Sequence, residues 1–267
     1  MKPAHLSEFQ ILTVENLTKR FGGVLALEDV SFSVTKGQII GLIGPNGAGK
    51  TTLFNCITGL SVPDRGSLYF GDSQTLLNRL SPYEIAAKGI SRTFQTIRLF
   101  KHVSAIENVL VGAHSKTRGG LASCLFRPRW VKVEEEKMRT QAIRLLSFFG
   151  LAHKADELAN NLSYGHQRKL EITRALASDP KLLLLDEPAA GMNPKEKEEL
   201  LDLIRTIRDR GITIILIEHD MKVVMPISDH VVVLDHGKKI AEGTPKEVQN
   251  NPRVIEAYLG KEINHDS

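Results

Sequence analysis

The feature that most constrains this chain is a glycine-rich loop at residues 44–52, with the sequence Gly-Pro-Asn-Gly-Ala-Gly-Lys-Thr-Thr. It matches G-x-x-x-x-G-K-[ST], the Walker A pattern, in which backbone N–H groups surround phosphate oxygens. An apolar run at 38–43 precedes the loop and a helical pattern at 52–57 follows it, so a buried strand leads to a helix N-terminus that favours anions. Lys50 can then reach the β- and γ-phosphates, and the Thr51 hydroxyl can bind Mg²⁺. The predicted nucleotide-binding residues of this loop are Gly44, Pro45, Asn46, Gly47, Ala48, Gly49, Lys50, Thr51 and Thr52.

A second pattern, at residues 181–188, has four leucines followed by Asp186 and Glu187. Such a run is typical of a strand buried on both faces of a parallel sheet, with its acids at the C-terminal edge, where α/β sheets bind ligands. Asp186 is therefore a candidate Mg²⁺ ligand, and Glu187 a candidate for polarising the attacking water. Taken alone, the pattern also fits a buried strand followed by solvated acids; the Walker A loop upstream favours the catalytic interpretation.

Between these motifs, residues 162–168 read Leu-Ser-Tyr-Gly-His-Gln-Arg and lead into a helical pattern. Here the chain resembles the ATP-binding cassette (ABC) ATPases, whose signature is LSGGQ followed by a helix. Ser163 and Gly165 match the signature, whereas Tyr164 and His166 depart from it. The resemblance implies that Ser163, Gly165 and His166 contact ATP bound to a second copy, and therefore a dimer that encloses two ATP molecules head to tail. A Tyr at 164 argues against a required positive φ there.

Further marks of the same family follow in order along the chain. The resemblance implies that Phe21 stacks on adenine, that Gln95 contacts Mg²⁺ or the attacking water, and that His219 hydrogen-bonds the γ-phosphate. On composition alone, Phe21 fits a core position and His219 a surface position; the order of the motifs favours the functional interpretation. Asn193 stands where many relatives have Asp. The predicted catalytic residues are Glu187, His219 and Gln95, and the predicted metal ligands are Thr51, Gln95 and Asp186.

The resemblance also implies the fold: an α/β P-loop NTPase with a RecA-like parallel-sheet core, an antiparallel β subdomain and an inserted helical subdomain. We expect one ABC ATPase domain at 11–260, with the helical subdomain at about 96–162 and a C-terminal hairpin and helix at about 236–260. Residues 1–10 and 261–267 are expected to be tails. The local patterns agree: strands at 11–20, 27–35 and 66–70, an apolar stripe of Leu200, Leu203, Ile204 and Ile207, a helix before Gly150, and a capping box at 244–247.

Charge, apolar runs and cysteine content indicate where in the cell the protein is found. The net charge is +4 and the pI about 9.0, which permits contact with an anionic membrane surface but does not require it. No apolar run approaches the ~18 residues of a membrane helix, and the first residues lack a signal-peptide core. Cys56 and Cys124 have no metal-binding spacing and fit a reducing compartment. We expect a peripheral protein at the cytoplasmic face of the inner membrane.

Several stretches resemble the ATPase subunits of branched-chain amino acid (LIV) importers in particular: residues 91–100, 107–112, 162–172, 187–194 and the extra segment 114–133. This resemblance implies ATP and Mg²⁺ as cofactors and a homodimer or a heterodimer with a related ATPase subunit. It also implies transmembrane permease subunits, an indirect link to a solute-binding protein, and no nucleic-acid partner. ATPases of urea, other amino acid and lipopolysaccharide-export transporters lie close by and remain alternatives.

The role of one segment and the class of the whole protein still have alternative interpretations. The segment 114–133 interleaves basic residues with bulky apolar ones, including Trp130, so it fits either a contact with membrane or permease or an ordinary loop packed on the helical subdomain. A soluble ABC ATPase acting on ribosomes or DNA is a rival, but this chain has one cassette and no sustained heptads. A P-loop kinase is disfavoured by the signature and by His219.

Overall fold

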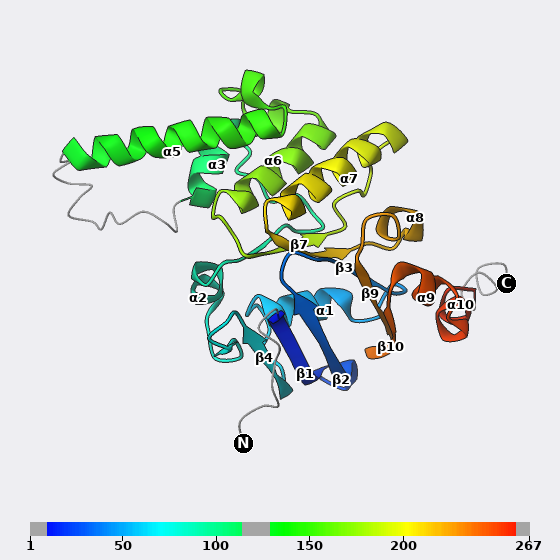
Figure 1. Ribbon diagram of the computed structural model, residues 1–267. Helices are drawn as coiled ribbons and strands as arrows, with labels where there is room; N and C mark the ends of the chain where they lie inside the picture. The colour runs from blue at the N-terminus through cyan, green and yellow to red at the C-terminus, as the bar shows by residue number, and fades with distance from the viewer. Residues whose placement is uncertain (1–9, 114–128, 260–267) are drawn as a thin grey trace. The chain divides into compact units, whose positions relative to one another are not determined.

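The computed structural model describes residues 10–113 and 129–259, and the chain divides into two compact units. We name residues 1–92 and 181–267 the core unit, and residues 93–180 the helical unit. The helical unit contains the predicted subdomain range, 96–162, and continues through the helix that follows the signature. Figure 1 shows the elements of both units along the chain.

Two β-sheets form the core unit. The larger has the strand order β10-β9-β3-β8-β7-β6, in which only β10 is antiparallel to its neighbour. The smaller sheet is antiparallel, in the order β2-β1-β4-β5. The strands are β1 (Gln10–Phe21), β2 (Val24–Thr35), β3 (Ile39–Ile43), β4 (Arg65–Phe70), β5 (Thr75–Leu76), β6 (Ile90–Arg92), β7 (Leu182–Asp186), β8 (Thr213–Ile217), β9 (His230–Asp235) and β10 (Lys238–Gly243).

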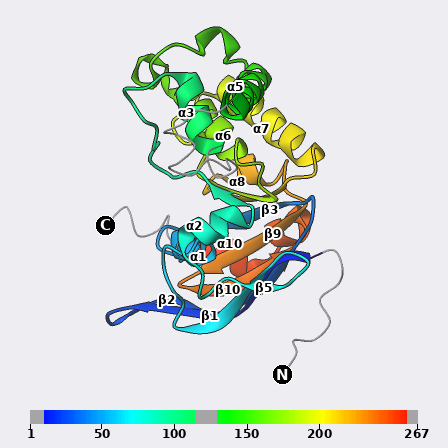
Figure 2. The ribbon, with the colours of Figure 1, turned by 90° about the vertical axis from the view of Figure 1, so that its left-hand side faces the viewer.

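The central strands β3, β7 and β8 are buried along their whole length. Their sequences are almost continuous Ile and Leu, as a parallel strand covered on both faces requires. Helix α1 (Lys50–Ile57) contributes Leu53 and Phe54 to one hydrophobic core that also includes residues of both sheets. The turned view shows β1 and β2 on one side of the core unit and β3 and β9 on the other (Figure 2). The predicted strands at the Walker motifs are confirmed.

The remaining helices of the core unit begin at clear capping signals. Thr244 and Asn193 each form a capping box with the Glu three residues later, and each is followed by Pro at the first helical position. The capping box at 244–247 is thus confirmed. In the predicted stripe, Leu200, Ile204 and Ile207 are buried, whereas Leu203 is only partly buried. These helices are α2 (Pro82–Ala87), α7 (Pro194–Asp209), α8 (Met221–Val224), α9 (Pro245–Gln249) and α10 (Pro252–Leu259).

In its described residues, 93–113 and 129–180, the helical unit contains α3 (Ala105–Ala113), α5 (Arg129–Phe148) and α6 (Tyr164–Leu176), with two short 3₁₀ turns, Ala152–Lys154 and Ala159–Asn161. Helices α3 and α6 pack so closely that a Cβ on Gly112 would lie 2.1 Å from the Arg174 carbonyl oxygen. Gly150 has a φ of 71° just beyond α5, which confirms the predicted glycine stop. Residues 114–128 lie outside the described residues, so the two interpretations of that segment stay as they were.

None of the helices within residues 10–113 and 129–259 combines the length and hydrophobicity that crossing a bilayer requires.

Candidate nucleotide-binding site

The Walker A loop connects β3 to α1 and depends on glycine at two close approaches. Gly44 has a φ of 150°, and a Cβ there would lie 2.0 Å from the Leu234 carbonyl oxygen. Gly49 has a φ of 102°, and a Cβ there would lie 2.5 Å from the Ala26 carbonyl oxygen. The loop therefore packs directly against the main chain of β9 and β2. A side chain at either glycine would clash with these strands and displace the loop.

Lys50 is the first residue of α1 and is almost fully buried. Its ammonium donates to the carbonyl oxygens of Gly44, at 2.6 Å, and Pro45, at 2.9 Å. The charge is therefore held within the loop by main-chain carbonyl oxygens. Thr51, the next residue of the helix, is exposed.

The Walker B carboxylate lies at the C-terminal end of β7. Asp186 is buried, with 3% of its side chain exposed, and its Oδ2 accepts a hydrogen bond from Arg92 Nη2 at 2.8 Å. The other end nitrogen of the same guanidinium, Nη1, donates to Asn55 Oδ1 at 2.7 Å. One arginine therefore holds Asp186 next to a residue of α1.

Glu187 and His219 lie just beyond the ends of the neighbouring parallel strands β7 and β8, close to each other. Glu187 Oε2 is 3.9 Å from His219 Nδ1, and His219 exposes 59% of its side chain. Glu187 has a φ of 47°, a strained value for a residue with a side chain, and its N–H donates to the Ile217 carbonyl at 2.9 Å. The two predicted catalytic residues are thus placed at the sheet edge by the main-chain hydrogen bond between Glu187 and Ile217, and the imidazole is open to solvent.

A second carboxyl group, Glu218, lies beneath this pair. It is 1% exposed, its Oε2 is 3.9 Å from His219 Nδ1, and its Oε1 accepts the Ala189 N–H at 2.9 Å. Burial raises the pKa of Glu218, and the backbone hydrogen bond from Ala189 opposes that shift. Glu218 therefore joins the segment after β8, which contains His219, to the turn that follows Glu187.

Phe21 is the last residue of β1, beside the hairpin turn at 22–23. Half of the Phe21 ring is exposed, and Lys19 Nζ lies 5.3 Å from its centroid. An exposed aromatic ring at the end of a strand is compatible with the predicted role in stacking on a base, and incompatible with the alternative of a core position.

The predicted residues of the helical unit are Gln95, Ser163, Gly165 and His166. Ser163 is the N-cap of α6, and its hydroxyl accepts the His166 N–H at 3.4 Å. Tyr164 has no positive φ, in agreement with its bulk. Burial lowers the pKa of His166. Gln95 is exposed, while its carbonyl oxygen accepts a hydrogen bond from Arg168 Nη2 at 2.8 Å.

Arg168 and Glu171 form a buried ion pair on α6 that holds the backbone around Gln95. Arg168 Nη1 lies 2.9 Å from Glu171 Oε2, and the exposed fractions of the two side chains are 0% and 1%. Arg168 also donates to the Phe94 carbonyl at 2.7 Å, and Glu171 accepts the Arg98 N–H at 3.1 Å. The signature helix and the loop at 94–98 are therefore joined by charge-assisted hydrogen bonds.

Comparison with known proteins agrees with this arrangement. A family model described as "ABC transporter" matches residues 27–190, which include the Walker A loop, the signature and the Walker B strand. The chain belongs to the ABC transporter family. A second model, described as "Branched-chain amino acid ATP-binding cassette transporter", matches residues 238–263.

Individual members of the family are similar over nearly the whole chain. The high-affinity branched-chain amino acid transport ATP-binding protein BraF of Pseudomonas aeruginosa is 45% identical over 252 residues, which cover 94% of this chain and 98% of BraF. A solved ATP-binding cassette of an ABC transporter in its ADP conformation is 39% identical, with a TM-score of 0.82 and coverage of 94% of this chain and 99% of that chain. A dimeric cassette in a post-hydrolysis state, bound to ADP and Pi, is 27% identical, with a TM-score of 0.74 and coverage of 88% and 99%. The predicted family, the α/β P-loop fold and the enzyme class, an ATP hydrolase, are confirmed.

The C-terminal segment of this ABC cassette packs behind the Walker A loop. The matched region begins with β10 and includes α9 and α10. Val248 and Val254 from these helices join one buried cluster with Ile43, the last residue of β3. Tyr258 packs against the same cluster, and burial raises its pKa to about 12. The segment therefore supports the strand from which the phosphate loop departs.

Three features of this ABC cassette were missed by sequence reasoning: Arg92, Glu218 and the Arg168–Glu171 pair. Arg92 and Glu218 stood inside motifs that had been assigned to their neighbours, Gln95 and His219. In the sequence, Arg92 and Glu218 are visible only as charged residues beside an apolar run. A charged residue in that place is more often on the surface, in contact with solvent. Only the fold reveals that these side chains are buried.

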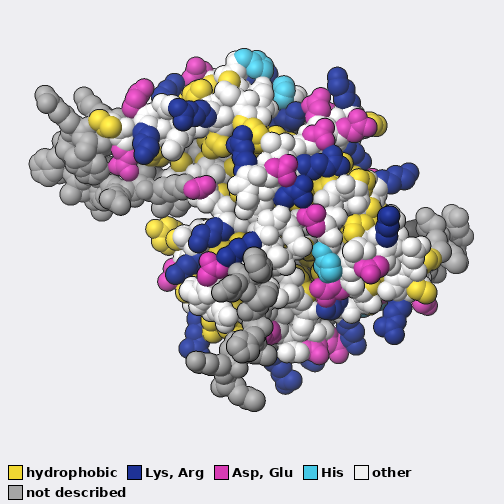
Figure 3. Space-filling view, viewed as in Figure 1, with side chains coloured by type: hydrophobic (Ala, Val, Ile, Leu, Met, Phe, Trp, Pro, Cys, Tyr) yellow, Lys and Arg dark blue, Asp and Glu magenta, His cyan; other side chains and the backbone are white. Residues whose placement is uncertain are grey.

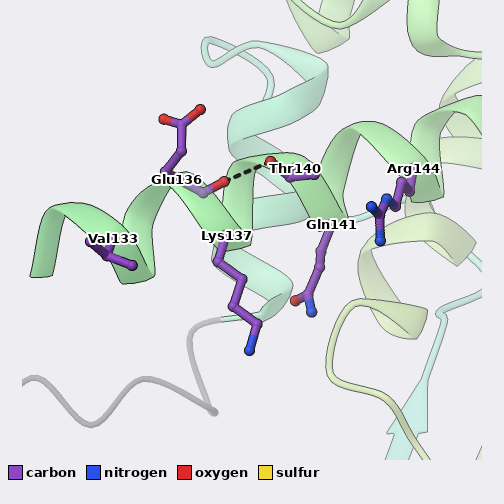
Figure 4. A pocket seen from close by; sticks show the side chains of 6 residues that line it. All are labelled: Val133, Glu136, Lys137, Thr140, Gln141 and Arg144. Atoms are coloured by element: carbon purple, nitrogen blue, oxygen red, sulfur yellow. Dashed lines mark hydrogen bonds between the residues drawn. The ribbon is translucent and has the colours of Figure 1, made fainter. Parts of the chain in front are cut away.

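A hollow of about 470 Å³ lies along α5, and none of the predicted site residues is among its lining residues. Figure 4 shows its lining side chains on successive turns of that one helix, with Thr140 Oγ1 donating to the Glu136 carbonyl at 2.9 Å. The lining residues are Val133, Glu136, Lys137, Thr140, Gln141 and Arg144. We assign no part in nucleotide binding to it.

Proposed function

We propose that this chain is the ATP-hydrolysing subunit of an importer for branched-chain amino acids. The ATP-hydrolysing role is supported by the C-terminal edge of the larger sheet, and the solute by the similarity to BraF, a branched-chain amino acid transport ATP-binding protein. At this edge the Walker A loop follows β3, Asp186 ends β7 and Glu187 follows it, and His219 lies just beyond β8, with Glu187 and His219 3.9 Å apart. Ligands of α/β sheets bind at such an edge.

Each residue at this edge has one task in hydrolysis. Water attacks the γ-phosphorus, a new P–O bond forms, and the bond to the β,γ-bridging oxygen breaks. Glu187 orients the water and accepts its proton, because it is the more accessible of the two carboxyl groups beside His219: 16% of its side chain is exposed, against 2% for Glu218. His219 hydrogen-bonds a γ-phosphate oxygen, and Lys50 neutralises charge on the β- and γ-phosphates.

The oxygen donors at this edge fit Mg²⁺. Asn55 and Asp186 bind the two ends of one guanidinium, so the face of α1 that carries Asn55 is turned toward Asp186. Thr51 lies one helical turn earlier on that face. Mg²⁺ in nucleotide sites takes one or two protein oxygens together with phosphates, so Asp186 and Thr51 would hold it, with Gln95 as the third proposed ligand. When bound, the ion neutralises charge on the β- and γ-phosphate oxygens.

The proposed partner in catalysis is a second cassette, either a copy of this chain or a related ATPase subunit. Ser163, Gly165 and His166 lie at the N-terminus of α6, a position that favours a bound anion. In the proposed dimer these residues contact the γ-phosphate held by the partner's Walker A loop. ATP binding then closes the dimer and hydrolysis reopens it, so that nucleotide state and conformation are coupled.

We further propose that the dimer works at the cytoplasmic face of the inner membrane. Its motion would reach transmembrane permease subunits through the loop at Gln95, and the permease would receive solute from a binding protein. We propose no nucleic-acid partner, because the similar proteins are transport ATP-binding proteins. Figure 3 shows Lys and Arg intermixed with Asp and Glu on the visible face.

Replacing Lys50 by Ala tests the nucleotide site directly. The variant loses charge-assisted hydrogen bonds to two phosphates, so we expect ATP affinity to fall at least about tenfold. AMP affinity should change less, because AMP lacks these phosphates. Equilibrium titration with labelled nucleotide measures both, and Lys36→Ala, an exposed lysine of the core unit, is the control. Unchanged ATP affinity would remove Lys50 from the site.

The transported solute is tested in cells. Deleting the gene should abolish most ATP-dependent uptake of labelled leucine, isoleucine and valine, and the wild-type chain should restore it. Urea uptake should not change. Loss of urea uptake with normal leucine uptake would assign the cassette to a different importer while leaving the ATPase chemistry intact.

A further inference from the structure

Arg92 occupies an unusual position for an arginine, because its charged end lies inside the core unit. Only 6% of its side chain is exposed. The guanidinium lies between three groups: the Asp186 carboxylate, the Asn55 amide oxygen and the Phe54 ring, whose centroid is 5.3 Å from Arg92 Cζ. A planar fork with several N–H donors matches this arrangement in a way that a lysine ammonium cannot.

The sheet register explains how Arg92 reaches Asp186. Arg92 ends the edge strand β6 and pairs with Leu184 of β7. Leu184 and Asp186 are two residues apart and therefore point to the same face of the sheet. Arg92 consequently reaches diagonally along β7 to the carboxylate, and the ion pair joins the ends of both strands to α1.

The partner of this arginine is the proposed metal ligand. A buried carboxylate needs a compensating cation, and Arg92 supplies one from within the chain. Mg²⁺ bound at Asp186 would supply a second. Two cations beside one carboxylate repel each other, and this repulsion is strong because the site is screened from water. Metal binding and the Arg92–Asp186 pair therefore oppose one another.

We propose that Arg92 is a positioning residue that holds the Walker B carboxylate and competes with Mg²⁺ for it. The proposal rests on the role assigned to Asp186 above. Arg92 is also the last residue of the first segment of the core unit, and Thr93 begins the helical unit. Occupation of the metal site therefore loosens the ion pair at the residue where the chain leaves the core unit, three residues before Gln95.

The test measures how much a divalent cation improves nucleotide binding. A non-hydrolysable ATP analogue is titrated with Mn²⁺ and then with EDTA, and the ratio of the two affinities is the metal-dependent gain. Removing the competing cation in Arg92→Gln should raise this gain about tenfold, which corresponds to about 1.4 kcal/mol. In Arg92→Lys, which keeps the charge but loses the fork, the rise should be smaller, about threefold.

The control is Arg205→Gln, the same substitution in an exposed ion pair with Asp202 on α7. It removes the same charge from the core unit, so the metal-dependent gain should equal that of the wild type. Circular dichroism establishes that each variant is folded. If Arg92→Gln does not fold, Arg92→Lys carries the test alone.

A second measurement separates competition from simple support of the fold. Without metal, Arg92→Gln should lower the thermal unfolding midpoint, and adding Asp186→Asn should restore part of it, because the buried charge is gone. A residue that merely stabilises the fold would lower the midpoint and leave the metal-dependent gain unchanged. A gain in Arg92→Gln that equals or falls below the wild-type gain overturns the proposal.

Asp186→Asn distinguishes this inference from the proposed function. It should abolish most of the metal-dependent gain. If it does not, the role assigned to Asp186 is wrong, whatever Arg92 does. If Asp186→Asn loses the gain and Arg92→Gln matches the wild type, only the inference about Arg92 fails.

Discussion

Replacing Glu187 by Gln is expected to lower ATP hydrolysis at least about 10²-fold while ATP binding persists. Gln keeps the size of the side chain but cannot accept the proton of the attacking water. Asp186, Lys50 and the Walker A loop are unchanged, so the nucleotide site remains. Because hydrolysis is what reopens the proposed dimer, the variant should accumulate as an ATP-bound dimer. Steady-state phosphate release measures the first effect and gel filtration with ATP the second.

Glu198→Gln is the matched control, because Glu198 is exposed on α7 in the same unit. Its turnover should equal that of the wild type. Near wild-type turnover in Glu187→Gln, or an ATP complex that stays monomeric, would contradict the assignment of Glu187. Glu218 would then be the next carboxyl group to test, since it lies 3.9 Å from the same imidazole nitrogen.

Replacing Ser163 by Arg is expected to lower the rate of ATP hydrolysis about 10²-fold or more. It should also prevent ATP-dependent dimer formation. The exposed N-cap of α6 would gain bulk and charge where the proposed partner's γ-phosphate must fit. The chain's own Walker A loop is unaffected, so single-site ATP binding should survive. Ser147→Arg, at an exposed position of α5 in the same unit, should behave as the wild type.

A mixture of Ser163→Arg and Lys50→Ala chains sharpens this test. In the head-to-tail heterodimer, one composite site carries both changes and the other carries neither. Hydrolysis should therefore return in the mixture if one site can act alone. Loss of ATP binding in the isolated Ser163→Arg chain, with circular dichroism unchanged, would place Ser163 in its own chain's site and contradict the two-copy mechanism.

The sequence predicted those parts of the fold in which local pattern and long-range packing demand the same residues. The aliphatic runs at β3 and β7 fit buried central strands, and the glycines of the Walker A loop fit a tight turn. The capping box at Thr244 is decided within four residues, so it too could be read directly. The order of the motifs then supplied the family.

The sequence could not predict which distant charges meet. Arg92 contacts Asn55 and Asp186, which are 37 and 94 residues away along the chain, and no local pattern encodes these separations. The end of the helical unit was missed for a similar reason. In the sequence, the signature marks the end of the predicted subdomain, and the helix after it has no pattern that connects it to residues 96–162. In the structure, α6 packs on α3 at Gly112 and belongs to the unit that ends at Pro180.

The Arg168–Glu171 pair has a consequence for how such a motor can diversify. Its hydrogen bonds to the loop reach the carbonyl oxygens of residues 94 and 95 and the N–H of residue 98. These atoms are the same in every amino acid, apart from the missing N–H of proline. The side chains of the loop other than Gln95 can therefore change over evolutionary time without breaking the main-chain hydrogen bonds that join the loop to the signature helix.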